Sequence, residues 1–279
     1  MTPCDGLQWV VQALTDPFHP SAVQPAAMFA LDKPVGPTAA QALALLRASD
    51  SSLVGVKLGH AGRLDPLAEG LLTVLVGDEN RGVLSLRTQP KTYELDVLFG
   101  VRTDSFDALG LVTALTATTL DAAALRPACA SLEGDHLQRF PPFSQARVGG
   151  VSLIASSRAG IAVERPSALR TLSEIAFLGI TTLDAAAACA YALPRIALVH
   201  GDFRQEAIAD RWRAVTAERP GVSLTVASLR VCCSAGTYMR SLADDLGGAL
   251  GVPAIAWRIR RIAAGALTLD GARSLPSAK

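Results

Sequence analysis

The chain has 279 residues, of which 50% are hydrophobic, and its formal net charge is +1. This composition supplies a sizeable core and excludes a mostly disordered chain, while the near-neutral charge excludes a global field that attracts nucleic acid. RNA binding would therefore need a local basic surface. The five cysteines form no C-x-x-C pair and the four histidines lack helical metal spacing, so we expect a reducing compartment, no disulfide framework and no metal.

No apolar run approaches the roughly 20 residues that span a bilayer. The first residues have the features of neither a signal peptide nor a transit peptide. We therefore expect no membrane contact and an intracellular, cytoplasmic protein, or a mitochondrial one if the chain is a processed form.

The domain is expected to begin after an irregular N-terminal extension. Residues 1–27 contain four prolines, which favour irregular structure, and the domain is expected to occupy residues 28–279. Its first elements are a predicted strand at 28–31 and a predicted helix at 39–49, for which Thr38 is the expected N-cap.

A glycine-rich loop then presents an acid. The sequence GHAGRLDPLAEGLL predicts a bend in which Gly59 and Gly62 allow positive φ, followed by a buried strand at 71–76. Asp65 is therefore expected on a loop anchored by the core, where a ligand can reach its carboxylate. On spacing alone, a surface turn with a capping aspartate is an equally good interpretation.

The middle of the chain is predicted to alternate strands with loops. Residues 91–100 alternate in polarity, which predicts a half-buried strand that carries Tyr93 on its buried face. The segments expected to follow are a polar connection at 102–107, a strand near 110–114, a helix near 121–132, and a loop at 138–150 with arginines at 139 and 147.

The last third begins with a segment of different character. Residues 181–219 combine an alanine run with a charged stretch, which predicts an insertion or a helical side element. A strand is expected at 222–233, and a helix follows with Arg240 in its first turn. Because an arginine there opposes the helix dipole, we expect it to have a partner. The final strand, at 257–262, is predicted to offer a small basic edge.

Three separate segments thus each present one notable polar side chain. An arginine such as Arg240 can keep Asp65 ionised and oriented, and Tyr93 can supply a planar face and a hydroxyl group. An ionised carboxylate can then act as nucleophile or base. Composition alone does not place the three side chains together.

Five ordered motifs resemble those of the TruB family of RNA pseudouridine synthases, from about residue 28 to residue 267. They are LDKPVGPT, GHAGRLDPLAEGLLTVLVGDENR, KTYELDVLFGVRTDSFDALG, QRFPPFSQARVGG and VCCSAGTYMRSLADDLG. The resemblance implies an α+β pseudouridine synthase fold: a mixed, mostly antiparallel sheet with flanking helices and a central active-site cleft. It also implies that a flipped-out uridine, in the T-arm of tRNA or another structured RNA, is isomerised to pseudouridine without a cofactor.

The resemblance assigns a role to each matched residue. It makes Asp65 the catalytic aspartate, Tyr93 the ring beside the target base, and Arg240 the salt-bridge partner of Asp65. His60 is expected to enter the T-arm stem as the uridine leaves it. The full set of expected substrate-binding residues is His60, Arg63, Asp104, Arg147 and Tyr238.

Each assignment also has a purely structural interpretation. His60 could be a turn residue, Tyr93 a core aromatic residue, and Arg240 the partner of a helix acid such as Asp244 at i+4.

RNA is expected to be guided by arginines at 63, 139, 147, 258, 260 and 261, with recognition dominated by shape and phosphate.

The chain departs from the family pattern in three places. Position 63 is arginine where the family usually has threonine, and residues 181–219 replace a short connection. We also expect no C-terminal PUA domain of the kind that bacterial members have. Two classes of function therefore remain. One is an active RNA pseudouridine synthase, favoured because Asp65, Tyr93 and Arg240 are all present. The other is a non-catalytic RNA-binding or ribosome-assembly factor, with a protein partner docked on the insertion.

Overall fold

The computed structural model describes residues 28–276, so the predicted extension at 1–27 lies outside the described residues. The strands, in chain order, are β1 (Met28–Lys33), β2 (Leu58–Ala61), β3 (Glu69–Val76), β4 (Lys91–Phe99), β5 (Val101–Thr103), β6 (Val112–Leu115), β7 (Gly134–Arg139), β8 (Arg147–Val148), β9 (Val151–Ser152), β10 (Ser167–Asp184), β11 (Ser223–Cys233), β12 (Ala254–Ala264), β13 (Leu267–Thr268) and β14 (Arg273–Ser274). The helices are α1 (Ala39–Ser49), α2 (Val83–Arg87), α3 (Ala122–Ser131), α4 (Leu153–Arg158), α5 (Ala185–Ala197), α6 (Gln205–Glu218) and α7 (Met239–Ala249).

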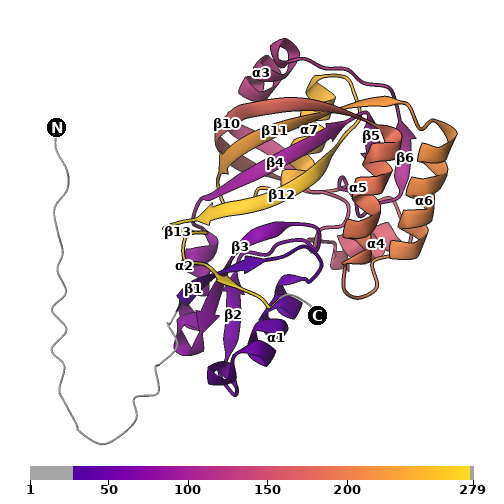
Figure 1. Ribbon diagram of the computed structural model, residues 1–279. Coiled ribbons are helices and arrows are strands. Elements are labelled where there is room, and N and C mark those ends of the chain that lie inside the picture. Colours follow the sequence, from indigo (N-terminus) through magenta and orange to yellow (C-terminus); the bar gives the residue numbers. More distant parts are fainter. Residues whose placement is uncertain (1–27, 277–279) are drawn as a thin grey trace, which may run out of the picture.

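One ten-stranded sheet forms the centre of the molecule (Figure 1). Its strand order is β14-β1-β3-β12-β4-β11-β10-β7, with β2 added to β3 and β13 added to β12. The pairs β1–β14 and β3–β12 are parallel, whereas the other pairs in this sheet are antiparallel. The sheet and its flanking helices confirm the predicted α+β fold with a mixed, mostly antiparallel sheet. Among the described residues, no helix combines the length and the apolar character that a bilayer crossing requires.

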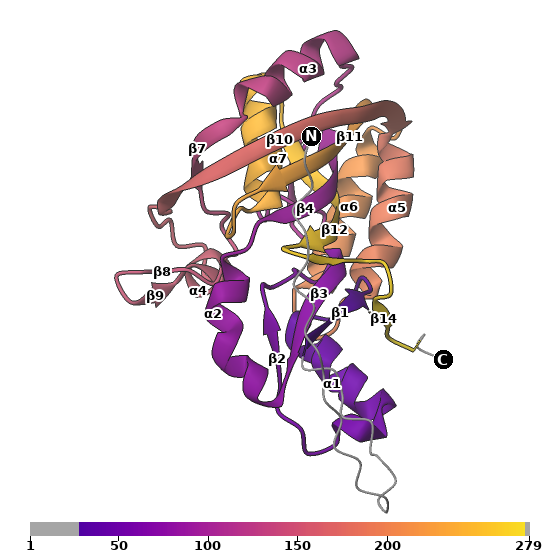
Figure 2. The same cartoon turned by 90° about the vertical axis from the view of Figure 1, so that its left-hand side faces the viewer.

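Alternation along the central strands divides the core between the two faces of the sheet. On β4, Leu95 and Val97 face a cluster completed by α3 and α7, whereas Leu98 faces a second cluster completed by α5 and α6. Figure 2, turned by 90°, shows α7 and the α5–α6 pair on different sides of these strands. A third cluster joins α1 to β1 and β3.

The first helix begins where the sequence predicts. Thr38 caps α1 by accepting a hydrogen bond from the amide of Gln41, and the Gln41 side chain accepts one from the amide of Thr38. This reciprocal capping box satisfies two backbone donors that helices otherwise leave free. The strands predicted at 91–100 and 222–233, and the helix after Gly236, are also confirmed.

The helical character predicted for the segment at 181–219 is confirmed, and its helices also form part of the core. It contains the end of β10 and the two helices α5 and α6, which lie against each other at one end of the sheet (Figure 1). The Trp212 ring of α6 is only 1% exposed, and its centre lies 5.9 Å from that of Trp257 on β12. The Trp212 indole also donates a hydrogen bond to the carbonyl of Ala108, at 3.1 Å.

The basic edge predicted at 257–262 is wrong. The strand β12 lies between β3 and β4, so it is a central strand. Arg258 is paired with Glu69 at 2.7 Å, and Arg260 is paired with Asp32 at 3.1 Å. Arg261 is 1% exposed. Arg258 and Arg260 are thus ion-paired within the sheet and Arg261 is buried, so the three do not form an exposed basic edge.

Two loop predictions also need correction. Gly59 and His60 do not bend, because they belong to β2 and pair with Leu75 and Val74 of β3. Only Gly62 of the two predicted glycines has a positive φ, at 79°. The polar connection predicted at 102–107 starts inside β5 and becomes a turn only from residue 104.

Candidate active site

Asp65 lies on the short loop between β2 and β3. Leu64 and Ala68, on either side of it, are buried in the core, and the Ala68 amide donates to the Asp65 carbonyl at 3.0 Å. The Asp65 side chain is nevertheless 43% exposed. The loop is therefore anchored at both ends while the carboxylate remains within reach of a ligand.

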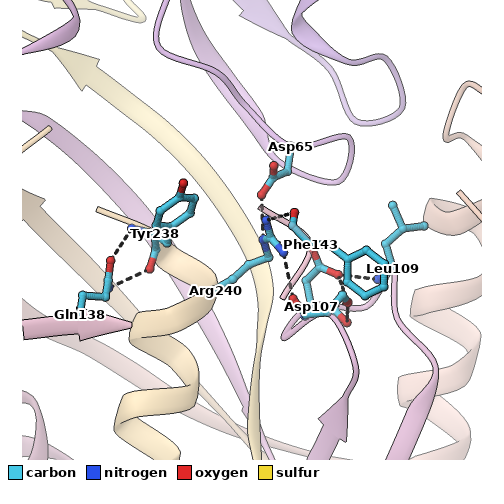
Figure 3. A network of polar contacts seen from close by, with 8 residues as sticks. Asp65, Asp107, Leu109, Gln138, Phe143, Tyr238 and Arg240 are labelled. Carbon is cyan, nitrogen blue, oxygen red and sulfur yellow. Dashed lines mark hydrogen bonds and ion pairs between the residues drawn. The ribbon is translucent and has the colours of Figure 1, made fainter. Parts of the chain in front are cut away.

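Arg240, in the first turn of α7, holds that carboxylate (Figure 3). Its Nε donates to Asp65 Oδ2 at 2.8 Å, and its other two nitrogens donate to the carbonyls of Ser105 at 3.0 Å and Phe143 at 3.2 Å. The Arg240 side chain is 4% exposed. The structure thus brings together the predicted pair, and the alternative partner Asp244 instead lies 4.0 Å from Arg102.

A second aspartate, which the sequence reasoning did not select, completes the network. Asp107 Oδ2 lies 3.7 Å from Arg240 Nε, and Asp107 Oδ1 accepts hydrogen bonds from the Ser105 hydroxyl at 2.6 Å and the Leu109 amide at 2.9 Å. Burial raises the pKa of Asp107, although the charge of Arg240 opposes this shift. Burial alone would lower the pKa of Arg240, but the charges of Asp65 and Asp107 outweigh it and raise that pKa. The signal for Asp107 was its place in the T-D-x-x-D segment.

Tyr93 enters from β4, where it is 8% exposed and lies opposite Arg261 of β12. Burial raises the pKa of the Tyr93 phenol; the charge of Arg261 opposes this rise, and the charge of Asp65 adds to it. The phenol is therefore neutral near pH 7. The Tyr93 ring belongs to the same buried cluster as Leu64 and Ala68, the residues that anchor the Asp65 loop.

Tyr238 precedes α7 and helps to fix the start of that helix. Its amide donates to the Gln138 side chain at 2.8 Å, and the same side chain donates back to its carbonyl at 3.1 Å (Figure 3). The Tyr238 ring packs on Phe140 with 5.1 Å between ring centres. Gln138, which is 1% exposed and was not selected from the sequence, thereby ties β7 to the helix that carries Arg240.

Among the described residues, the other predicted substrate-binding residues make no hydrogen bond or ion pair with Asp65 or Arg240. His60 is half-buried on β2, where burial and the charge of Arg63 lower its pKa, so its ring is neutral near pH 7. Arg63 is exposed beside the Asp65 loop, and Arg147 is exposed on the β8–β9 hairpin. Both oxygens of Asp104 accept hydrogen bonds from Arg204.

Lys33 is a further residue that the sequence reasoning left without a role. It is 0% exposed, and its ammonium donates to the carbonyls of Pro34 and Pro37, both at 2.8 Å. The turn that it holds reaches the Asp65 loop, because the Gly36 amide donates to the Pro66 carbonyl at 2.9 Å.

The buried ammonium predicts a dependence of stability on pH. Burial lowers the pKa of Lys33 from 10.5 to about 8, against the charges of Asp65 and Glu69. Between these two values the unfolded chain binds more protons than the folded one, so Lys33 makes the folded state more stable as pH rises. We expect guanidinium unfolding to show wild type gaining stability relative to Lys33→Met from pH 8 to pH 10. A difference that stays constant over this range would contradict the low pKa.

Two solved structures share this fold. One solved structure, titled a Cbf5-Nop10-Gar1 complex, matches with a TM-score of 0.55 and 22% identity over 89% of this chain and 52% of that one. Another, an H/ACA RNP bound to a substrate RNA containing 2'-deoxyuridine, matches with a TM-score of 0.54 and 20% identity over 89% of this chain and 50% of that one.

Sequence comparison is more specific. Residues 51–190 match the model of the TruB family pseudouridylate synthase N-terminal domain, and the chain belongs to this family. Proteins named tRNA pseudouridine synthase B are 37% identical over 245 residues in Ralstonia nicotianae and 36% identical over 250 residues in Cupriavidus taiwanensis. Each alignment covers 88% of this chain but only 65% and 64% of the relative, so the chain spans less than two thirds of these relatives' length.

Proposed function

We propose that the protein isomerises a uridine in RNA to pseudouridine, with Asp65 as the reacting group. The observation that carries this proposal is a solvent-accessible carboxylate fixed by a buried arginine, in a chain of the TruB family. Among the described residues, no group of three or more His, Cys, Asp or Glu side chains is arranged to hold a metal ion.

The reaction needs three events at one site. The bond between the sugar and nitrogen one of uracil breaks, and the uracil turns while it is held. Carbon five then joins the sugar and loses its proton to solvent, while nitrogen one takes up a proton. Asp65 would start the cleavage either by adding to the substrate or by removing a ribose proton. Arg240 would keep this carboxylate ionised and aimed. Because the Tyr93 phenol is neutral, we propose that Tyr93 packs its ring against the uracil and does not act as a base in the free enzyme.

The substrate must present an unstacked uridine, because the atoms that react are inaccessible inside a helix. The proposed substrate is tRNA, since the relatives that align over 88% of this chain are named tRNA pseudouridine synthase B. We propose His60, Arg63, Arg147 and Tyr238 as residues that contact this RNA. Asp104, which was expected among them, instead accepts from Arg204 with both carboxylate oxygens. A tRNA substrate implies an intracellular enzyme, and the cytoplasm is the proposed compartment. A protein partner bound by residues 181–219 stays a prediction.

Tritium release tests this function. The chain would be incubated with tRNA transcripts that carry tritium on carbon five of uridine, and in parallel with labelled fragments of ribosomal RNA. We expect release from the tRNA up to one equivalent per molecule, with the new pseudouridine located in the T-arm. RNA binding without release from either substrate would contradict catalysis and favour the non-catalytic RNA-binding alternative.

A further inference from the structure

The connection between α5 and α6 directs one arginine toward the active site. Arg204 stands immediately before α6 with a φ of 63°, which is uncommon for a residue other than glycine. Neighbouring side chains hold this conformation: Asp202 accepts from the Arg204 amide at 3.2 Å, and Gln205 accepts from the Phe203 amide at 2.8 Å. An unusual backbone conformation that is supported in this way fixes the direction of the Arg204 side chain.

The Arg204 guanidinium makes two contacts at once. Its two terminal nitrogens donate to the carboxylate of Asp104 at 2.8 and 3.2 Å, and its central carbon lies 4.5 Å from the centre of the Phe143 ring. The Asp104 carboxylate also accepts from the Leu111 amide at 2.9 Å, which closes the turn after β5. Lysine does not reproduce a fork on a carboxylate, and it makes contacts over an aromatic ring less often than arginine does.

The residues that Arg204 contacts lie in the same backbone segments as the carbonyls that bind Arg240. Of the two carbonyls that accept from Arg240, one belongs to Phe143 itself and the other to Ser105, the residue after Asp104. Arg204 therefore contacts a side chain in each of the two backbone segments that bind the Arg240 guanidinium.

Residues at the end of α5 and just after it contact the segments around Asp65, the other member of the pair. Arg195 donates to the carbonyl of Leu67 at 3.4 Å, two residues after Asp65. The His200 amide donates to the Gly36 carbonyl at 3.2 Å, within the turn that is bonded to the Asp65 loop. The segment at 181–219 thus contacts backbone segments that hold Asp65 as well as those that hold Arg240.

We propose that Arg204 is a positioning residue for the reaction, acting through Asp104 and Phe143 on Arg240 without touching the uridine. This inference rests on the proposed function. It assigns to the segment at 181–219 an internal role in catalysis, separate from the docking of a protein partner.

The test compares Arg204→Met with Arg213→Met, a control on the same helix whose side chain is 59% exposed and paired only with Asp210 among the described residues. Single-turnover tritium release at saturating RNA, RNA affinity and melting temperature would be measured for each. Because a shift of about 1 Å in a reacting group can cost about 100-fold in rate, we expect a loss of about 10-fold for Arg204→Met with RNA affinity unchanged. The control should keep the wild-type rate, and Arg204→Lys should give an intermediate one.

A double variant separates positioning from general stability. If Arg204 acts through Asp104, Asp104→Asn combined with Arg204→Met should be no slower than the slower single variant. Rates that multiply, or a loss that appears only in RNA affinity, would overturn the proposal.

Hydrogen exchange distinguishes failure of this inference from failure of the proposed function. If wild type releases no tritium, the proposed function fails, and the contacts of Arg204 are still testable. Arg204→Met should then speed amide exchange at 104–111 and 140–146 while exchange in α6 stays unchanged. Unchanged exchange in both segments would overturn the structural basis of the inference.

Discussion

Arg240→Met is expected to reduce pseudouridine formation on the order of 10²–10³-fold, the loss usual for a fixed donor that orients a reacting charge. The change removes the bond to Asp65 and leaves that carboxylate free to rotate. It also leaves the buried Asp107 without an ion-pair partner among the described residues, and breaking a buried pair costs about 3–5 kcal/mol. The protein should therefore lose both rate and stability.

Single-turnover rates and guanidinium unfolding would be measured side by side for this variant. Arg240→Lys is the informative companion, because lysine keeps the charge but cannot reach Asp65, Ser105 and Phe143 together. The exposed Arg230 on β11 offers a matched control, since Arg230→Met removes an arginine with no ion pair in the described part of the chain. Wild-type activity in Arg240→Lys would show that the three simultaneous contacts of the guanidinium are not needed.

Trp212→Ala is expected to destabilise the fold by about 3–5 kcal/mol, the usual cost of removing a large aromatic side chain from a core. Trp212 is 1% exposed, and its removal would leave a cavity beside Trp257 and free the carbonyl of Ala108. This prediction tests whether α5 and α6 belong to the core.

Urea unfolding of Trp212→Ala and Tyr191→Ala would supply the comparison. Tyr191 of α5 also stacks on Trp257, with 4.8 Å between the ring centres, but Tyr191 is 37% exposed. Its loss should cost about 1 kcal/mol, because much of its surface is already in water. Equal and small effects of both changes would mean that the two helices are dispensable for stability.

The sequence predicted the central part of this structure because pattern and motif agree there. The alternation around Tyr93 gave β4, and the capping residues around Thr38 gave α1. The pairing of Asp65 with Arg240 came from the order of the family motifs, because no local pattern relates residues 175 positions apart.

Other features have no local signal. The longest strand, β10, was not predicted because its register shifts between Leu172 and Glu174 and again between Phe177 and Gly179. Such bulges interrupt the alternation by which a strand is recognised. β2 was taken for a bend because Gly59 favours turns, yet pairing with β3 overrides that preference.

The residues that hold the active-site loops, Arg204 and Lys33, were not predicted for a related reason. Arg204 and Asp104 are 100 residues apart in the sequence. Arg204 also has a left-handed backbone conformation, which an arginine in the sequence does not predict. Lys33 looked like part of a polar turn, but the fold buries it completely. Contacts of this kind are set by tertiary packing and become visible only in three dimensions.

The central claim is that the Asp65 carboxylate carries out the isomerisation. Asp65→Asn keeps the size of the side chain and an oxygen that can accept from Arg240, while it removes the charge. The decisive measurement is single-turnover conversion of labelled uridine in tRNA by wild type and Asp65→Asn, with RNA affinity determined for both. We predict complete conversion by wild type and none by the variant at equal affinity, whereas equal conversion by the two proteins would contradict the assignment of Asp65.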